Sequence, residues 1–539
     1  MLVEQLVEWL WLLMGGTSHQ VFCTLLVFVG VLLLVKIGLW LKSNVTLPPG
    51  PLGVPLLGYL PFIKDDAHLH FTKLAKRFGS IFSMYLGSEL VVVLSDYRVI
   101  RDAFRREEFS GRPNTDFMNV IEGYGIINTQ GALWKDQRKF LHEKLRSFGM
   151  THLGTGKKSM NTRIMREVEI FLWGLVKRRG KPTNISPSLA VSISNVICSL
   201  TMSVRFHNGD LNFKRFMDLI DEGFRLFASL TSANYITLFR HLPWIHGTRD
   251  RIARNRGEMA QFFQSIIDHH REHYDEDNIR DIVDAYLCEI KQTEKENPDY
   301  QIFEGKNKDR QMQQILGDLF SAGMETVKNT LEWAVIFMLH HPEAAKAVQN
   351  ELDEVVGRTR MPSLEDLPYL PLTEATIQEV LRRSNIVPLG TPHATTRDVK
   401  LNGYTLPAGT HVMPLVYAVH MDPELWEEPE AFRPERFLAS DGKVRKPEYF
   451  MPFGVGRRMC LGDLLARMEL FLFFSSLMHK FDLLLPEGAP LPSLRGNVGI
   501  TQSPKPFEVC FSLRCLEPPE YCPSNDGNPN GPLRNIGSH

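Results

Sequence analysis

A short stretch near the C-terminal end, Phe-Gly-Val-Gly-Arg-Arg-Met-Cys-Leu-Gly at 453–462, constrains the fold of this chain more than any other segment. Gly456 and Gly462 permit tight turns and let the backbone approach a large flat group closely. Arg458 places a fixed cation two residues before Cys460, and an apolar run that predicts a buried helix follows. Aligned N–H groups at a helix start favour a thiolate. Cys460 is therefore either a metal ligand or, like most free cysteines, a buried structural residue.

The spacing F-x-x-G-x-R-x-C-x-G decides between these interpretations. Every fixed residue type of this pattern is present, and the pattern resembles the haem loop of the cytochrome P450 family. The resemblance implies that Cys460 is the axial thiolate ligand of a haem b iron. It also implies that Phe453, Gly456 and Arg458 help to bind the haem. A thiolate ligand suits an oxygen-activating haem.

Composition excludes several other classes of protein. The 539 residues are 43% hydrophobic and 23% charged, with a formal net charge of −1, so nothing in the overall charge predicts a nucleic-acid partner. The seven cysteines are scattered and form no C-x-x-C pair. This pattern argues against a disulfide framework or a zinc site and favours a reducing compartment for the bulk of the chain.

The N-terminal region predicts a membrane anchor. Residues 21–41 are apolar apart from Lys36 and are long enough to span a bilayer. Glu4 and Glu8 precede this segment and lysines follow it, so we expect residues 1–20 in the lumen or at the interface and the rest in the cytosol. No positive n-region or cleavage site for a signal peptide is visible. The resemblance places such a single-pass protein in the endoplasmic reticulum.

The remaining organisation follows from composition and from the resemblance. Residues 42–52 hold the run Pro-Pro-Gly-Pro and predict a stiff hinge. Residues 53–515 correspond to the haem-thiolate monooxygenase domain, for which the resemblance implies a mainly α fold with a smaller β region. Two β-rich runs at 81–86 and 89–94, separated by Gly-Ser, predict a hairpin within it. Residues 516–539 are rich in Pro, Gly, Asn and Ser and predict a disordered tail.

Two further segments match the family at positions that hold the haem propionates. Trp134 and Arg138 lie four residues apart on a predicted helix and therefore share a face. Either could donate to an anion, although a solvated helix with one anchoring Trp is equally consistent with this pair alone. The resemblance assigns Trp134, Arg138, His393 and Arg458 to the two propionates. The same helix carries Lys135, Lys139, Lys144 and Arg146, which form either an ordinary solvated face or a docking face for an acidic electron-transfer partner.

The residues 311–340 predict one long helix, because they lack proline and are rich in helix formers. Within it, the Thr326 hydroxyl can bond to the carbonyl of Ala322, and Gly323 allows a close approach. Alone, this pattern is more often a simple kink. It also matches the A-G-x-[ED]-T motif of the family, which implies that Thr326 and Glu325 hold and pass protons during dioxygen activation.

A structural network is implied by two more matches. Glu379 and Arg382 are three apart on a predicted helix and are neighbours there, which by itself predicts only a surface pair of little energetic value. The family's E-x-x-R pairs instead with the Arg of a Pro-Glu-Arg-Phe tetrapeptide, here Arg436. The resemblance therefore implies a buried network of Glu379, Arg382 and Arg436 that supports the haem loop.

The substrate contacts are predicted from apolar segments at family positions. Residues 386–391 predict a strand-like run that faces the substrate, and residues 497–501 predict a last substrate-facing turn. The candidates are Phe117, Ile121, Phe227, Leu230, Ala322, Val387, Leu389 and Ile500. Apolar stripes of this kind more often form core than ligand contacts.

The resemblance implies hydroxylation of a lipophilic substrate with dioxygen and NADPH electrons. These would arrive through a diflavin NADPH–cytochrome reductase, with cytochrome b5 as a second electron donor. Overall likeness favours insect ecdysteroid 26-hydroxylases that inactivate the moulting hormone. Ecdysteroid 25-hydroxylation and xenobiotic or fatty-acid hydroxylation are alternatives, as are a haem-thiolate isomerase or dehydratase and a non-catalytic haem protein. The intact Gly323, Glu325 and Thr326 argue against the non-oxygenase classes.

Overall fold

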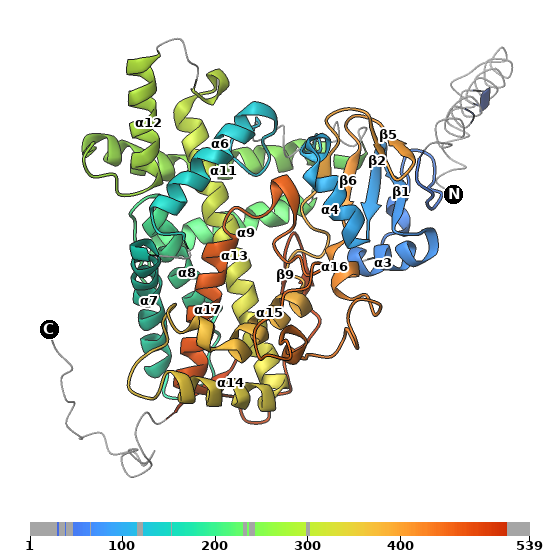
Figure 1. The fold of residues 1–539 in the computed structure, drawn as a ribbon. Helices are drawn as coiled ribbons and strands as arrows, with labels where there is room; N and C mark the ends of the chain where they lie inside the picture. The colour runs from blue at the N-terminus through green and yellow to red at the C-terminus, as the bar shows by residue number, and fades with distance from the viewer. Residues whose placement is uncertain are drawn as a thin grey trace, which may run out of the picture.

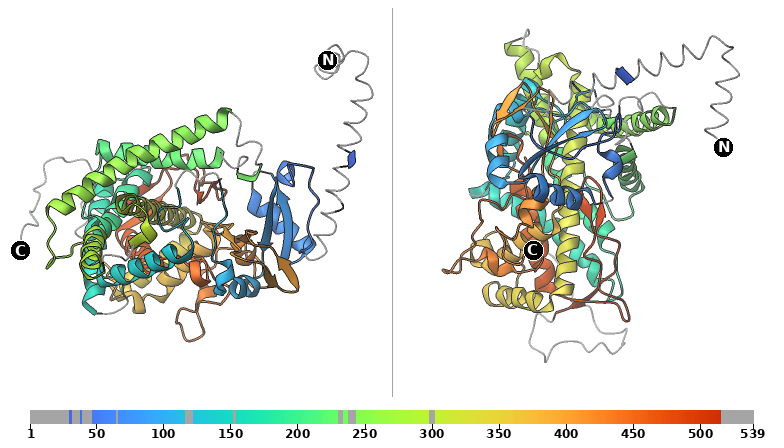
Figure 2. Two further views of the ribbon diagram at one scale, coloured as in Figure 1. Left: turned by 90° about the horizontal axis from the view of Figure 1, so that it is seen from above. Right: turned by 90° about the vertical axis from the view of Figure 1, so that its right-hand side faces the viewer.

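The protein was analysed as a computed structural model that describes residues 30–31, 38, 47–64, 66–115, 122–151, 154–229, 234–236, 243–297 and 302–514. A large helical part and a smaller part with most of the strands lie side by side (Figure 1). Two further views show the strands gathered at one side of the molecule (Figure 2). This arrangement agrees with the predicted mainly α fold with a smaller β region.

The helices account for most of the described chain. They are α3 Ala67–Phe78, α4 Tyr97–Arg105, α6 Gly131–Ser147, α7 Gly154–Val176, α8 Ser186–Thr201, α9 Leu211–Ser229, α11 Pro243–Glu272, α12 Ile282–Glu296, α13 Lys308–His340, α14 Pro342–Val355, α15 Pro371–Ser384, α16 Val416–His420 and α17 Asp463–Lys480. Short 3-10 helices are η1 Leu60–Phe62, η2 Glu107–Phe109, η4 Ile302–Gly305, η5 Leu367–Tyr369, η6 Pro434–Phe437 and η7 Gly456–Arg458.

Among the described residues, the strands form one sheet of four strands and three short pairs. They are β1 Ile81–Leu86, β2 Glu89–Leu94, β3 His393–Ala394, β4 Val399–Leu401, β5 Tyr404–Leu406, β6 His411–Pro414, β7 Phe481–Leu484, β8 Asn497–Val498, β9 Gln502–Ser503 and β10 Cys510–Leu513. The larger sheet has the order β1-β2-β6-β3, with β2 and β6 parallel. The predicted hairpin is confirmed as β1 and β2, which pair with Ile81 opposite Leu94.

Alternation of side chains along β1 and β2 lets the sheet pack on both faces. Val92 and Leu94 belong to one buried cluster, together with Phe104 of α4. Val91 and Val93 point to the opposite cluster, which includes residues of α3. Asp96 caps α4 by accepting hydrogen bonds from the N–H groups of residues 98 and 99 at 2.7 and 3.1 Å. The sheet thereby fixes the position of α4.

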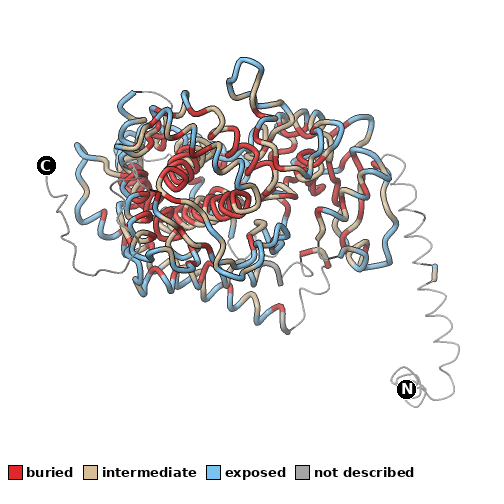
Figure 3. Tube along the Cα trace, turned by 90° about the horizontal axis from the view of Figure 1, so that it is seen from below, coloured by how far each residue is buried: buried red, intermediate tan, exposed pale blue. Residues whose placement is uncertain are grey.

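Helices α13 and α17 run through the centre of the helical part (Figure 1). The predicted helix at 311–340 is confirmed as α13. Asn307 caps its N-terminus, because the Asn307 side chain accepts a hydrogen bond from the N–H of Arg310 at 3.0 Å. Both helices are buried over much of their length, and buried residues concentrate in the helices at the centre (Figure 3). Gly323 permits the close packing of α8, because a Cβ there would lie 2.6 Å from Ile197 Cδ1.

The prediction of a strand-like run at 386–391 is wrong, because these residues form a turn. The N–H of Gly390 donates to the carbonyl of Val387 at 3.0 Å, and Gly390 adopts a positive φ of 57°. Pro388 has no N–H to offer a neighbouring strand, so a ladder cannot pass through this position.

Several predicted segments lie outside the described residues. They include residues 1–20, nearly all of the predicted anchor at 21–41, residues 42–46 of the hinge and the tail at 516–539. In the described ranges, no helix combines the length and apolar character needed to cross a membrane.

A buried network joins α15 to η6. The Glu379 carboxylate accepts two hydrogen bonds of 2.7 Å from Arg382, one of 3.1 Å from Arg436 Nε and one of 2.9 Å from the N–H of Arg433. Arg382 also donates to the carbonyl of His420 at 2.8 Å. The predicted trio is therefore assembled in the structure, with the Glu379 and Arg382 side chains fully buried.

We expect Glu379→Gln to lower the free energy of unfolding by about 3–5 kcal/mol, because it leaves buried guanidinium groups without their counter-charge. The midpoint of guanidinium chloride unfolding, followed by circular dichroism, measures this loss. The matched control is Glu374→Gln on the same helix, whose partly exposed ion pair with Lys446 predicts about 0–1 kcal/mol. Equal losses in both variants would contradict the network.

Buried neutral histidines predict sensitivity to acid. Burial lowers the pKa of His420 to about 3. Its Nδ1 faces Asn385 Oδ1 at 3.0 Å, while Nε2 accepts from the N–H of Met451 at 3.1 Å. Since the unfolded pKa is about 6.5, the unfolded state gains the proton first. Stability is then complete above that value and falls as the pH drops toward 3.

Because of His420, we expect the free energy of unfolding to fall by up to about 1.4 kcal/mol for each unit that the pH drops across this window. Urea midpoints measured between pH 7.5 and 4.5 test this, with His420→Gln giving the flatter profile. The same slope in His420→Gln and the parent protein would contradict the assignment. His142→Gln, at an exposed position, serves as the control.

Candidate active site

The loop at 453–462 is held in shape by its own backbone and by α4. The N–H of Cys460 donates to the carbonyl of Phe453 at 2.9 Å, and Gly454 and Gly456 both have positive φ. A Cβ at Gly456 would lie 2.1 Å from the Phe104 carbonyl oxygen, so only glycine fits this contact. The loop leads directly into α17, as predicted.

The thiol of Cys460 is surrounded by protein atoms, although the residue as a whole is accessible to solvent. Ala322 is likewise exposed although it lies at the middle of α13, where Phe320 and Met324 are buried. Both residues are therefore accessible to solvent although neighbouring residues of the loop and of α13 are buried. Burial raises the pKa of the Cys460 thiol, while the N–H of Gly462 lowers it. A bound cation such as iron would favour the thiolate further.

Arg458 is the centre of a buried group of cations. Its Nε and Nη2 donate to the Ser110 carbonyl at 3.0 and 2.8 Å, and Nη2 also donates to the Thr129 carbonyl at 2.6 Å. Its guanidinium stacks on the Trp134 ring at 3.8 Å. Within the described ranges, Nη1 has no hydrogen-bond partner. A buried donor in this state is costly unless another acceptor binds it.

Two more arginines complete the group. Arg138 donates to the carbonyl of Met459 at 2.5 Å, and Arg112 donates to the carbonyls of Ile127 and Pro392 at 2.8 and 2.5 Å. Burial, together with repulsion from Arg112 and Arg138, lowers the pKa of Arg458. Mutual repulsion of this kind favours an anionic ligand.

His393 belongs to the same group. Burial and the charge of Arg112 lower its pKa to about 3, so the ring is neutral at physiological pH. Nδ1 donates to the Phe109 carbonyl at 2.8 Å, and the ring stacks on Phe104 at 3.8 Å. This leaves Nε2 with a lone pair, so His393 becomes a second donor to an anion only when it takes up a proton.

The residues present fit a haem. Arg112, Arg138 and Arg458 offer positive charge for two carboxylates, Arg458 Nη1 is a donor still to be satisfied, and Cys460 is accessible to a ligand. No sequence motif identified Arg112 as part of this site. Its role depends on contacts with residues 127 and 392, which no local pattern reveals.

Thr326 and Glu325 lie on α13 as predicted, and the structure adds two partners. The Thr326 hydroxyl donates to the Ala322 carbonyl at 2.8 Å. The Glu325 carboxylate accepts from Lys328 Nζ and from Asn329 Nδ2, each at 2.9 Å. Lys328 was also missed, although its spacing of three residues from Glu325 is the signal of a helical ion pair.

Lys328 faces three carboxyl groups. Burial lowers its pKa, but contact with Glu325 and the charges of Glu332 and Asp221 outweigh burial, so the pKa is raised. Burial raises the pKa of both Asp221 on α9 and Glu332 on α13. One lysine therefore balances a group of acids that extends from Glu325 to the neighbouring helix.

The predicted substrate segments converge in part. The N–H of Gln502 donates to the Ile386 carbonyl at 2.8 Å, which joins the β8–β9 hairpin to the turn holding Val387 and Leu389. Asn329 Nδ2 approaches Thr501 Oγ1 at 3.3 Å, which joins the same hairpin to α13.

The predicted contacts differ in how far the structure places them. Val387 and Leu389 are half-buried, whereas Ile500 is 45% exposed. Phe117, Ile121, Leu230 and the side chain of Phe227 lie outside the described residues.

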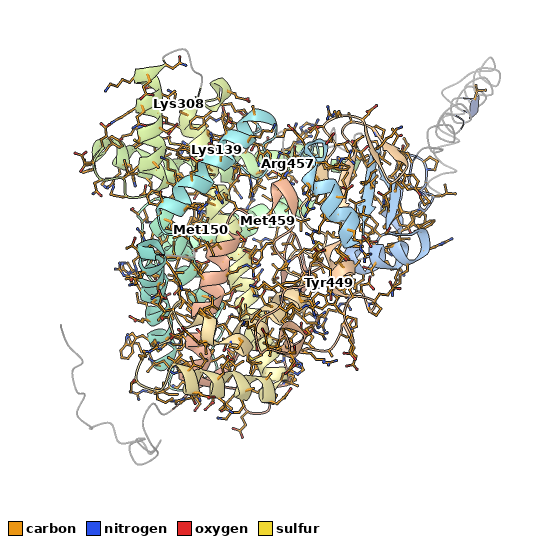
Figure 4. All side chains as sticks on the ribbon, viewed as in Figure 1. Lys139, Met150, Lys308, Tyr449, Arg457 and Met459 are labelled. Carbon is orange, nitrogen blue, oxygen red and sulfur yellow. The ribbon has the colours of Figure 1, made fainter. Side chains whose placement is uncertain are left out.

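A basic surface lies next to the loop. Figure 4 labels Lys139, Arg457 and Met459 near the junction of α6 with the start of α17. A hollow of 320 Å³ opens here. Its lining residues are Trp134, Lys135, Arg138, Lys139, His142, Glu143 and Arg457.

Comparison with known proteins agrees with this geometry. The family model "Cytochrome P450" matches residues 48–511. The chain is 56% identical to "Cytochrome P450 18a1" of Drosophila melanogaster, over 97% of this chain and 96% of that protein. It is 37% identical to "Cytochrome P450 2U1" of Rattus norvegicus, over 87% and 91%, and 38% identical to "Cytochrome P450 2F2" of Mus musculus, over 87% and 94%. The chain therefore belongs to the cytochrome P450 family of haem-thiolate monooxygenases.

Proposed function

We propose that this monooxygenase hydroxylates a steroid, namely an ecdysteroid at C26, and thereby inactivates the hormone. The observation that carries the proposal is the 56% identity to an insect protein along nearly the whole of both chains, against 37–38% for the two mammalian relatives. This pattern supports the likeness to insect ecdysteroid 26-hydroxylases. Hydroxylation at C25, or of xenobiotics or fatty acids, are the competing reactions that an assay distinguishes.

The cofactor of the family is haem, whose thiolate-ligated iron supplies dioxygen activation with NADPH-derived electrons. In our proposal Cys460 binds the iron, with Phe453 and Gly456 shaping the loop around it. Arg138 and Arg458 bind the propionates, with Trp134 positioning Arg458 through its ring. His393 joins them once the negative charge of the propionates raises its pKa enough for the ring to take up a proton. The buried positive charge and the unpartnered Nη1 of Arg458 support these roles.

We assign proton delivery to Thr326 and Glu325. The Thr326 hydroxyl is bonded to the carbonyl of the exposed Ala322, one turn back on α13, and Glu325 is the adjacent carboxyl group that would replace its proton. Lys328 and Asn329 hold the Glu325 carboxylate on both oxygens. Proton transfer from Glu325 therefore depends on how firmly Lys328 holds the charged form.

The redox partner proposed is a diflavin NADPH–cytochrome reductase, with cytochrome b5 as a second donor. The basic residues around the 320 Å³ hollow support an acidic partner surface, and steering by charge would make association slower at high salt. We further propose that residues 21–41 anchor the protein in the endoplasmic reticulum membrane through the hinge at 42–52. The domain of residues 53–515 would then lie in the cytosol, with residues 1–20 in the lumen or at the interface and 516–539 as a tail.

We expect microsomes that contain this protein and a reductase to convert 20-hydroxyecdysone to 26-hydroxylated or 26-carboxylated product. Mass spectrometry identifies the product, and Cys460→Ser, which removes the proposed ligand, abolishes both the product and the thiolate-type Soret band of the reduced, CO-bound protein. A 25-hydroxylated product would contradict the proposed C26 position and favour C25 hydroxylation. Turnover of fatty acids with no steroid product would contradict the proposed steroid substrate.

We expect Lys328→Met to raise hydrogen peroxide release per NADPH and to move the pH profile of coupling. The product rate should fall by no more than about 100-fold, the lower end of the loss expected when a general acid or base is removed. Without Lys328, the carboxyl groups of Glu325, Asp221 and Glu332 lose their counter-charge, so at least one of them binds a proton at higher pH.

Lys328→Arg should restore the original pH profile, and Lys346→Met, at an exposed position on α14, should leave it unchanged. An unaltered profile in Lys328→Met with a normal Soret band would exclude the role of Lys328.

A further inference from the structure

Three side chains at the end of α11 are arranged as metal ligands, in a part of the surface that the proposed reaction does not use. His269, Glu272 and His273 each offer one ligand atom, and these atoms lie within 4.8 Å of one another. The spacings of three and four residues place all three side chains on one helical face. The two imidazole rings are 4.3 Å apart between centroids, and all three residues are exposed.

A second observation indicates that His273 is prepared to bind a metal. Its Nδ1 donates to the carbonyl of His269, four residues back, at 2.9 Å. This bond fixes the tautomer and leaves the lone pair on Nε2. Histidine ligands in metalloproteins usually donate their other ring N–H to a backbone carbonyl in this way.

The charges around the three side chains permit a cation. α11 ends at Glu272, and the C-terminal end of a helix carries partial negative charge. The neighbouring guanidinium of Arg271 is already neutralised by Asp309, at 2.9 Å, and by Asp268, at 3.0 Å. The Glu272 carboxylate is left to balance part of the charge of a bound ion.

The buried face of the same turn is a structural contact and not a second site. His270 Nε2 lies 2.8 Å from Asp281, and its Nδ1 donates to the Ile266 carbonyl at 2.8 Å. Asp284 is held by Arg280 through two hydrogen bonds of 2.6 and 2.9 Å. These contacts tie α11 to the start of α12 from within.

We propose that His269, Glu272 and His273 bind one divalent transition-metal ion of the Zn²⁺ type at the surface. Two imidazoles and a carboxylate provide three ligands, and water completes the tetrahedral set that Zn²⁺ prefers. Nitrogen ligands select against Mg²⁺ and Ca²⁺, which require oxygen. The ion joins residues on both sides of the helix end and so stabilises the exit of the chain toward α12. The site is independent of the haem and of its substrate.

The test is a titration of the full-length, haem-loaded protein with ZnCl₂ against a chromogenic chelator. We expect His269→Ala and His273→Ala each to weaken binding of one equivalent by about tenfold or more, which corresponds to about 1.4 kcal/mol. The double variant should lose that equivalent, while His246→Ala, an exposed position on the same helix, should keep it. Excess Mg²⁺ should not compete, and acid should weaken binding because protons compete for the imidazoles.

Two further readouts keep the proposal falsifiable. Co²⁺ bound at this site should show no thiolate charge-transfer band, which separates it from binding to cysteine. Zn²⁺ should slow hydrogen exchange at residues 273–281 in the parent protein but not in the double variant, with the same Soret band in both. Equal Zn²⁺ equivalents in the parent protein and the double variant would overturn the proposal. A thiolate band with Co²⁺, or equal affinity for Mg²⁺, would do the same.

Discussion

The cluster of three arginines around the buried Arg458 is the constraint on which the proposed haem-binding side of this protein depends. Arg458 reaches the carbonyls of residues 110 and 129, Arg112 reaches those of 127 and 392, and Arg138 reaches that of 459. These bonds connect four segments that are far apart in sequence. They also place three like charges close together, which is unfavourable without an anion. In our proposal, haem binding and the order of these segments are coupled, because the propionates would remove the repulsion between the three guanidinium groups.

Local patterns predicted the parts of the structure that local interactions form. The β1–β2 hairpin, α13 and the loop before α17 lie where the residue types placed them, because alternation, helix formers and paired glycines act over a few residues. The trio of Glu379, Arg382 and Arg436 was predicted from two motifs, and the structure brings the three side chains together.

Long-range contacts explain what was not predicted. Residues 386–391 form a turn, since Pro388 has no N–H to donate to a neighbouring strand. Position 390 is a glycine in close contact with Pro414, because a Cβ there would lie 2.5 Å from the Pro414 Cγ. Arg112 is defined by carbonyls at residues 127 and 392, which no pattern near residue 112 encodes. The substrate contacts depend on segments that only tertiary packing brings to α13.

The polar groups of α13 connect substrate binding to proton delivery. Asn329 Nδ2 contacts both the Glu325 carboxylate, at 2.9 Å, and Thr501 Oγ1, at 3.3 Å. Thr501 lies in the β8–β9 hairpin beside Ile500, a predicted substrate contact. One amide thus contacts both the proposed catalytic acid and the predicted substrate-facing turn. Under these proposed roles, a substrate that shifts the hairpin would change the hydrogen bonds of Asn329, and through them the balance between Lys328 and Glu325. Selection of a substrate and supply of its protons would then be parts of a single network.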